Sequence, residues 1–262
     1  MVKTFRWEMV DDVAHLILAN PPVNLIDLDA LDEYGEAVAE IVESDARAVL
    51  LRAEGKVFSA GADVSTFEGV DSEEARRRFT RWLPYVQALE AAPVPTVAAV
   101  HGMCLAGGLE LALACDVILA AEGTKLGQTE ATVGTTTLLG GAQRVAQRAG
   151  AARAKMICFG AQLYDAAQFE RWGIVDQVLP AETFLEEATA LAVSYAQGPT
   201  AAHRAVKGMI AAGVAGGVSA ADRFLLDEAL SVFDTRDMAH GVEMLMEHGA
   251  TRFTSHTTFS GL

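Results

Sequence analysis

The chain has 262 residues, of which 51% are hydrophobic, with 23 glycines and 7 prolines. A chain of this length and composition can bury a substantial core, which excludes a disordered protein, a collagen-like repeat and a small disulfide-stapled scaffold. The 20 Lys and Arg against 35 Asp and Glu leave a net charge of −15, which argues against a sequence-independent grip on nucleic acid or on an anionic membrane, because both need clustered cations.

Cysteines and apolar stretches bear on the cellular compartment. The three cysteines lack metal-type spacing and fit a reducing environment, where free Cys is usually a buried, inert side chain. Residues 1–8 lack the apolar core of a secretory signal. The most apolar stretch, residues 94–121, contains His101, Glu110 and Asp116, which argue against a membrane span. We therefore expect a cytoplasmic globular protein.

The first part of the chain alternates between strand and helix patterns. Residues 5–10 and 13–19 are β-rich runs separated by Asp11-Asp12, which predicts a hairpin. A helix is expected next, with Asp27 or Asp29 capping its first turn. The apolar face of this helix comprises Leu28, Leu31, Val38, Ile41 and Val42.

Two further units of strand, loop and helix follow. The apolar runs 48–51 and 96–100 predict buried strands, each followed by a loop of small residues. Residues 71–74 are a capping signature for a long helix that stops at Pro93, and Pro84 should kink or interrupt it. The side chains that this helix should bury are Phe79, Trp82, Val86 and Leu89.

The alternation ends about halfway along the chain. A helix over 109–115 and a strand over 117–121 complete it, and beyond Glu130 helical patterns dominate, with one strand expected at 174–178. The last helices are expected at about 181–196, 201–212, 220–233 and 237–248. This order predicts an α/β fold with a largely parallel sheet.

Two loops at strand ends suggest a binding site for an oxygen atom. Residues 56–64 and 101–111 each follow a buried strand and are rich in small residues, which let a ligand approach the backbone closely. In the second loop, Gly107 and Gly108 stand where a helix begins, so their N–H groups are unpaired donors reinforced by the helix dipole. Two such loops are the minimum for an oxyanion hole, although each alone is equally typical of a tight turn.

Two carboxylates stand in apolar or uncharged surroundings. Glu110 lies in the first turn of an apolar helix, where it is either a helix-end charge or a functional group with a raised pKa. Glu130, taken alone, is more typical of a surface or capping residue. Motifs for phosphate, dinucleotide or zinc binding are absent, as is a nucleophile elbow, and the six histidines lack ligand spacing. Hydride transfer, phosphoryl transfer and metal-dependent hydrolysis therefore lack their usual residues.

Several motifs, in order and over nearly the whole chain, resemble the crotonase (enoyl-CoA hydratase/isomerase) family. They are F-S-A-G-A-D at 58–63, A-G-G-L-E-L-A-L-A-C-D at 106–116, L-G-Q-T-E-A-T-V-G at 126–134 and G-G-A-Q-R at 140–144. The resemblance implies an α/β fold with a spiral core of ββα turns, residues 1–200, and a C-terminal helical region, residues 201–262. That region is expected to cover the site and to form a homotrimer or a dimer of trimers.

The resemblance also implies roles for particular residues. The N–H groups of Ala62 and Gly107 would form the oxyanion hole for the carbonyl of a CoA thioester. Glu110 would deprotonate a water that adds at Cβ, and Glu130 would deliver a proton to Cα. Binding of the substrate or its CoA is expected from Lys56, Ala60, Asp63, Val64 and Gly108. No metal is required, and no cofactor beyond the CoA of the substrate.

Three segments depart from the family pattern. Thr129 stands where hydratases usually have Pro, and residues 136–139 replace a stretch that commonly contains Pro and Gly, so the acyl chain length is open. Ser65 stands where some hydratases carry Lys, which leaves Lys56 as the nearest candidate cation. Near the C-terminus, residues 239–250 lack a Lys that often meets the CoA phosphates.

The leading interpretation is an enoyl-CoA hydratase. An enoyl-CoA isomerase, an acyl-CoA hydrolase or a retro-Claisen enzyme would share the oxyanion hole and differ in acid and base placement. From another class, the chain could be a non-catalytic binding protein or an RNA-binding member of the scaffold. The net charge of −15 argues against RNA, and the presence of both carboxylates argues against a catalytically idle protein.

Overall fold

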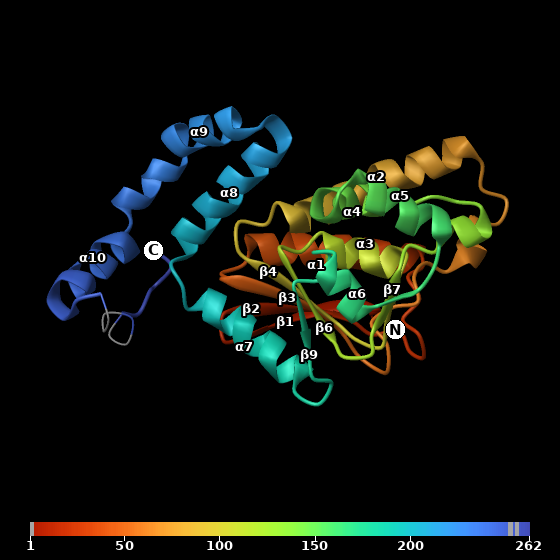
Figure 1. Ribbon diagram of the computed structural model, residues 1–262, viewed down its shortest axis with the longest axis horizontal. Helices are drawn as coiled ribbons and strands as arrows, with labels where there is room; N and C mark the ends of the chain where they lie inside the picture. Colours follow the sequence, from red (N-terminus) through yellow and green to blue (C-terminus); the bar gives the residue numbers. More distant parts are fainter. Residues whose placement is uncertain (1–2, 251–253, 255–256) are drawn as a thin grey trace.

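The computed structural model describes residues 3–250, 254 and 257–262. The parts of the predicted core and C-terminal region that fall on residues 1–2, 251–253 and 255–256 lie outside the described residues. Figure 1 shows a layered α/β body with a helical arm, drawn in blue, that projects away from it. No described helix is both long enough and apolar enough to cross a membrane.

The body is built on a six-stranded sheet in the order β1-β2-β3-β4-β6-β9. The first pair is the predicted antiparallel hairpin, and the other neighbours are parallel. The strands are β1 (Phe5–Val10), β2 (Val13–Leu18), β3 (Ala48–Ala53), β4 (Thr96–Val100), β6 (Val117–Ala121) and β9 (Gln177–Leu179). Strands β2 and β4 are buried along their whole length because both faces of the sheet are covered.

The strand expected at 174–178 begins later, at Gln177. Ile174 and Val175 are apolar because they pack in the core from a turn, in which the N–H groups of both residues donate to Phe169 O. Gly173, with φ of 73°, makes that turn possible. The strand expected over 174–178 is therefore confirmed at 177–178 and wrong at 174–176.

A second, three-stranded sheet contains β5 (Met103–Leu105), β7 (Lys125–Gly127) and β8 (Tyr164–Asp165). β5 lies within the segment expected to be a loop. Isolated bridges, Ser59 with Cys104 and Ile26 with Ala62, extend this layer to the other strand-end loop. Main-sheet strands are thus followed by a short extended segment and then a helix, which confirms the predicted spiral of ββα turns.

Helices cover both faces of the main sheet. On one side lie α1 (Leu28–Glu43), α2 (Ser72–Glu90), α3 (Gly107–Leu113), α4 (Gly141–Ala149), α5 (Ala151–Gly160) and α6 (Ala166–Arg171). The opposite face packs on α7 (Phe184–Ala196). Asp27 caps α1 and Asp71 caps α2, as predicted. Pro84 lies inside α2 without interrupting it. The expectation that Val42 belongs to the apolar face of α1 was wrong, because this side chain, in the last turn, is 38% exposed.

The arm consists of α8 (Thr200–Gly216), α9 (Val218–Asp227), the 3₁₀ helix η3 (Ala229–Asp234) and α10 (Arg236–His248). The single helix expected over 220–233 is divided at Glu228. Arg47 of the body anchors the arm: its guanidinium donates to Gly198 O at 2.7 Å, to Thr200 Oγ1 at 3.1 Å and to Phe259 O at 3.1 Å.

Candidate active site

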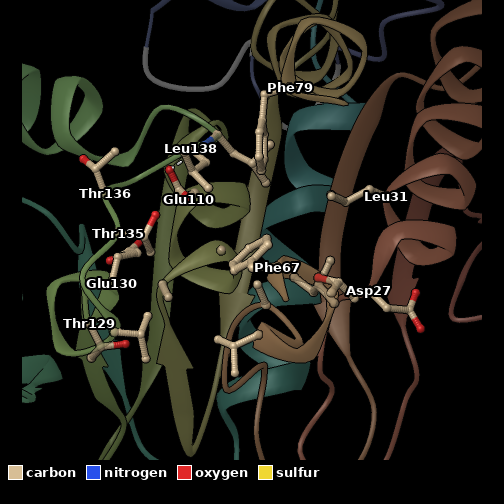
Figure 2. Close-up of a pocket in the computed structure, with 18 of the residues that line it drawn as sticks. Asp27, Leu31, Phe67, Phe79, Glu110, Thr129, Glu130, Thr135, Thr136 and Leu138 are labelled. Atoms are coloured by element: carbon tan, nitrogen blue, oxygen red, sulfur yellow. Dashed lines mark hydrogen bonds between the residues drawn. The ribbon is translucent and has the colours of Figure 1, made fainter. Parts of the chain in front are cut away.

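One pocket collects most of the predicted site residues. It encloses about 770 Å³, open mouth included, between the two strand-end loops, α1, α2 and the segment that follows β7. One wall is apolar and includes Leu31 and Phe67, whereas Leu138 lies on the opposite side, next to Glu110 (Figure 2). The facing wall carries Glu110, Glu130 and the threonines at 129, 132, 135 and 136. Figure 2 shows Glu130 and Thr135 next to each other on this wall, below Glu110.

The N–H groups of Ala62 and Gly107 border the same part of the pocket. Gly107 is the first residue of α3, so its N–H has no carbonyl one turn earlier. A Cβ added to Gly107 would lie 3.7 Å from the backbone nitrogen of Ala62. Within the part of the chain that the structure describes, neither N–H donates to a protein acceptor. Both residues line the pocket, so two N–H groups without a protein acceptor lie at the same site.

Ala106 directs the Gly107 donor, and the sequence reasoning missed it. Its φ of 45° and ψ of −122° place a residue with a Cβ where glycine is normally found, at a cost of about 1–3 kcal/mol. Two hydrogen bonds hold it there: its N–H donates to Gly127 O, and its carbonyl accepts from Glu110 N, both at 2.9 Å. Residue type gives no signal of this conformation, because alanine usually adopts negative φ.

Glu110 is buried and tied to a loop far away in sequence. Its Oε1 accepts from the N–H of Leu139 at 2.9 Å and from the N–H of Gly141 at 2.8 Å. Burial raises the pKa of this carboxyl, while the backbone donors and the charge of Arg144 act in the opposite direction. The carboxylate is thus fixed through one oxygen.

Glu130 begins the 3₁₀ helix η2 (Glu130–Val133), close to Glu110. Burial, together with the negative charge of Glu110, raises the pKa of Glu130 to about 7. Gln128 is fully buried, and with its amide turned to donate, its nitrogen lies 2.8 Å from Glu130 Oε1 and 3.2 Å from Oε2. Gln128 is a second site residue that the sequence reasoning missed, although it stands in the same motif as Glu130.

The predicted binding residues divide into two groups. Ala60 and Val64 line the pocket. Asp63 lies outside its lining and caps the 3₁₀ helix η1 (Val64–Phe67) by accepting from Ser65 N at 3.0 Å. Lys56 is exposed and does not line the pocket, so its expected contact with CoA stays a prediction.

Gly108 has a packing reason for lacking a side chain. A Cβ on Gly108 would lie 2.5 Å from Ser59 Cβ, which is impossible without a shift of the chain. Ser59 in turn donates through Oγ to Asn24 O and accepts from Gly61 N. Gly108 thus brings the two strand-end loops together from behind the pocket. Among the described residues no group of three or more His, Cys, Asp or Glu is placed to hold a metal ion.

Comparison with known proteins identifies the family of this chain. The model of the enoyl-CoA hydratase/isomerase family matches residues 8–256. A probable enoyl-CoA hydratase of Mycobacterium bovis is 32% identical over 93% of this chain and 95% of its own. Crotonyl-CoA hydratase of Syntrophomonas wolfei is 30% identical over 95% of this chain and 96% of its own. The crystal structure of an enoyl-CoA hydratase from Bacillus anthracis superposes with a TM-score of 0.88 at 27% identity, covering 99% of this chain and all of the other. The chain belongs to the enoyl-CoA hydratase/isomerase family.

Proposed function

We propose that this protein is an enoyl-CoA hydratase, which adds water across the 2,3 double bond of a 2-enoyl-CoA thioester. The observation that supports this most strongly is the pairing of two different carboxylates with two unpaired N–H donors in one pocket. The donors suit a thioester oxygen, and the carboxylates suit proton transfer at the two carbons that follow the carbonyl. The names of relatives described as hydratases support the same proposal.

In this proposal the oxyanion hole stabilises an enolate. As water adds at Cβ, electrons move to the thioester carbonyl, and its oxygen gains negative charge. The N–H groups of Ala62 and Gly107 donate to that oxygen, with the N-terminal end of α3 behind them. Loss of one such donor typically costs about 10²–10³-fold in turnover.

The environments of the two carboxyls support a division of labour. Glu110 accepts backbone hydrogen bonds that favour its ionised form, so it is the base that takes a proton from water. Glu130, with a pKa near 7, is substantially protonated at neutral pH and delivers its proton to Cα as the enolate collapses. Water thus supplies the hydroxyl at Cβ and a proton to Glu110. Proton exchange between the carboxyls then restores both.

We also propose that the arm mediates self-association into a trimer or a dimer of trimers. Its helices carry exposed apolar side chains, such as Ile210, Leu226 and Phe233, which are 62%, 67% and 64% exposed. Apolar surface of this extent usually marks an interface.

Incubation with crotonyl-CoA tests the proposed reaction. A hydratase removes the absorbance of the conjugated thioester and forms a product heavier by one water, which mass spectrometry detects. A hydrolase would instead release the CoA thiol, which a thiol reagent detects. An isomerase would convert a 3-enoyl-CoA to the 2-enoyl form without adding water. A panel of enoyl chain lengths in which none is hydrated would overturn the proposal.

A further inference from the structure

Arg144 is a buried cation that lies behind the candidate base. Its side chain is only 7% exposed, and it joins the end of α2 to the loop before α4. Arg144 Nε and Nη2 donate to Glu90 Oε1 and Oε2 at 2.9 and 2.6 Å, a two-pronged pair that fixes the plane of the guanidinium. Nη1 is left to face the loop, where it donates to Leu139 O at 2.9 Å and to Gly140 O at 3.2 Å.

The same loop holds Glu110 from its other side. The carbonyl of Gly140 and the N–H of Gly141 belong to one planar peptide group and point in opposite directions. The carbonyl accepts from Arg144 Nη1 at 3.2 Å, and the N–H donates to Glu110 Oε1 at 2.8 Å. One peptide therefore lies directly between the cation and the carboxylate. Hydrogen bonds in such a chain polarise one another, so a bond at the carbonyl strengthens the donor at the nitrogen.

The guanidinium packs against the loop backbone, which is also held by hydrogen bonds from Ala142 N to Thr137 Oγ1 at 3.1 Å and from Arg144 N to Gly140 O at 3.3 Å. Gly140 has φ of 99°, and neither it nor Gly141 has a side chain. A Cβ on Gly140 would lie 1.9 Å from Arg144 Nη1, so the guanidinium rests directly against this backbone. The loop conformation that presents its N–H groups to Glu110 is thus built around the arginine.

We propose that Arg144, oriented by Glu90, is a positioning residue for Glu110, acting through the Gly140–Gly141 peptide to fix the carboxylate that takes the proton from water. This inference rests on the proposed function for the role of Glu110. It concerns a residue that does not itself line the pocket. Besides Arg144 on α4, the titratable groups whose electrostatic interactions involve Glu110 include Glu130 on η2 and the Cys158 thiol on α5.

Steady-state kinetics of R144Q and R144K on crotonyl-CoA across pH test the proposal. R144Q should lower kcat by about 10–100-fold, a loss of the size seen when a group that orients a metal ligand is removed. KM should change less than about threefold, because no substrate contact is lost. The rise of kcat/KM with pH should move to higher pH, since a cation that favours ionised Glu110 is gone. R144K keeps the charge but loses the two-pronged geometry, so its kcat should fall while its pH profile stays near that of the wild type.

Arg148 supplies a matched control on the same helix. It is also largely buried, with its side chain 17% exposed, and it donates to Cys115 O at 2.7 Å and to Asp176 Oδ2 at 3.1 Å. R148Q should lower the melting temperature without moving the pH profile. If R144Q does not fold, E90Q provides the test, because Glu90 is 44% exposed and Gln removes the charge and one of the two acceptors that orient the guanidinium. A folded R144Q or E90Q with wild-type kcat and pH profile would overturn the proposal, as would an equal pH shift in R148Q.

A measurement that does not depend on catalysis tests this inference independently of the proposed function. Carbon-13 NMR of labelled glutamate carboxyls, with E110Q to assign the signal, follows the titration of Glu110 directly. The Glu110 signal should titrate at higher pH in R144Q than in the wild type. If the wild type hydrates no enoyl-CoA but this shift is seen, the proposed function fails and the role of Arg144 stands. If the enzyme is active but the titration is unchanged, the inference fails alone.

Discussion

The body and the arm differ in how far they bury their apolar residues. In the body, β2 and β4 are buried over their full length, and helices close both faces of the sheet. In residues 200–250, which make up the four helices of the arm, only Thr200, Ala229 and Asp237 are buried. The pocket and its carboxylates lie entirely in the body, because every residue that lines the pocket precedes Gly140.

Similar apolar periodicity therefore has two different consequences in the body and in the arm. The body buries its own apolar side chains. It can also hold Ala106 in a strained backbone conformation, because the surrounding contacts fix this residue. The arm carries helices of ordinary pattern whose apolar sides the chain itself does not cover. We therefore expect substitutions in the body to change chemistry without changing assembly, and substitutions in the arm to do the reverse.

The largest effect is expected from the carboxylates of the body. Glu110→Gln and Glu130→Gln should each reduce turnover of enoyl-CoA by about 10²–10⁴-fold, the usual contribution of a general base or acid. Both variants should fold and assemble as the wild type does, because Gln is nearly isosteric with Glu. The turnover of the double variant should fall by much less than the product of the two single reductions, because both carboxyls act in the same proton-transfer reaction. Wild-type turnover in either single variant would remove that residue from the mechanism.

A somewhat smaller effect is expected from the backbone donor. Gly107→Pro removes one N–H at the first position of α3, where proline is tolerated, and should cost about 10²–10³-fold in turnover. Gly107→Ala keeps the N–H and provides the control. Because Gly107 does not have a positive φ and its Cβ would meet only Ala62 N at 3.7 Å, the Ala variant should lose far less. Circular dichroism establishes that both fold; equal activity of the two would argue against this donor.

These predictions draw unequally on sequence and on structure. The strands and helices were predictable because apolar periodicity and capping residues such as Asp27 and Asp71 act locally. Glu110 and Glu130 were found from their uncharged surroundings together with the family resemblance. The bonds from Leu139 and Gly141 to Glu110 were not predictable, since they join residues 29 and 31 positions apart and use only backbone donors. The positive φ of Ala106 was not predictable either, because alanine usually adopts negative φ.

A change confined to assembly is expected from the arm. Leu226, 67% exposed on α9, should tolerate Asp within the isolated subunit, but a charge there should disrupt contact with another copy. Leu226→Asp should lower the molecular mass measured by light scattering at micromolar concentration and change kcat far less than Glu110→Gln does. Leu185→Asp, at a 45% exposed position of α7 in the body, is the matched control. A monomeric wild type, or an unchanged mass in Leu226→Asp, would contradict the proposed role of the arm.

The smallest effect concerns stability, and it belongs to the body alone. Burial raises the pKa of Glu130 to about 7 in the folded chain, against an ordinary value of about 4.3 in the unfolded chain. Between these values the folded state binds more protons, so the free energy of unfolding falls as pH rises toward 7 and stays lower above it. Gln does not titrate, so Glu130→Gln should be more stable than the wild type at pH 8, by about 1 kcal/mol after screening by solvent in the open pocket. That corresponds to about 2–4 °C in melting temperature. The gain should be largely absent at pH 4.5, where the wild-type carboxyl is already protonated in the fold.

Glu182→Gln, at an exposed position of the body, controls for the loss of one negative charge. Equal gains at both pH values, or the same gain in Glu182→Gln, would show that Glu130 is not held at a stability cost. A pH-dependent gain in Glu130→Gln, with no change in the molecular mass of the assembly, would show that the stability cost of the Glu130 carboxyl arises within the body and not at the interface.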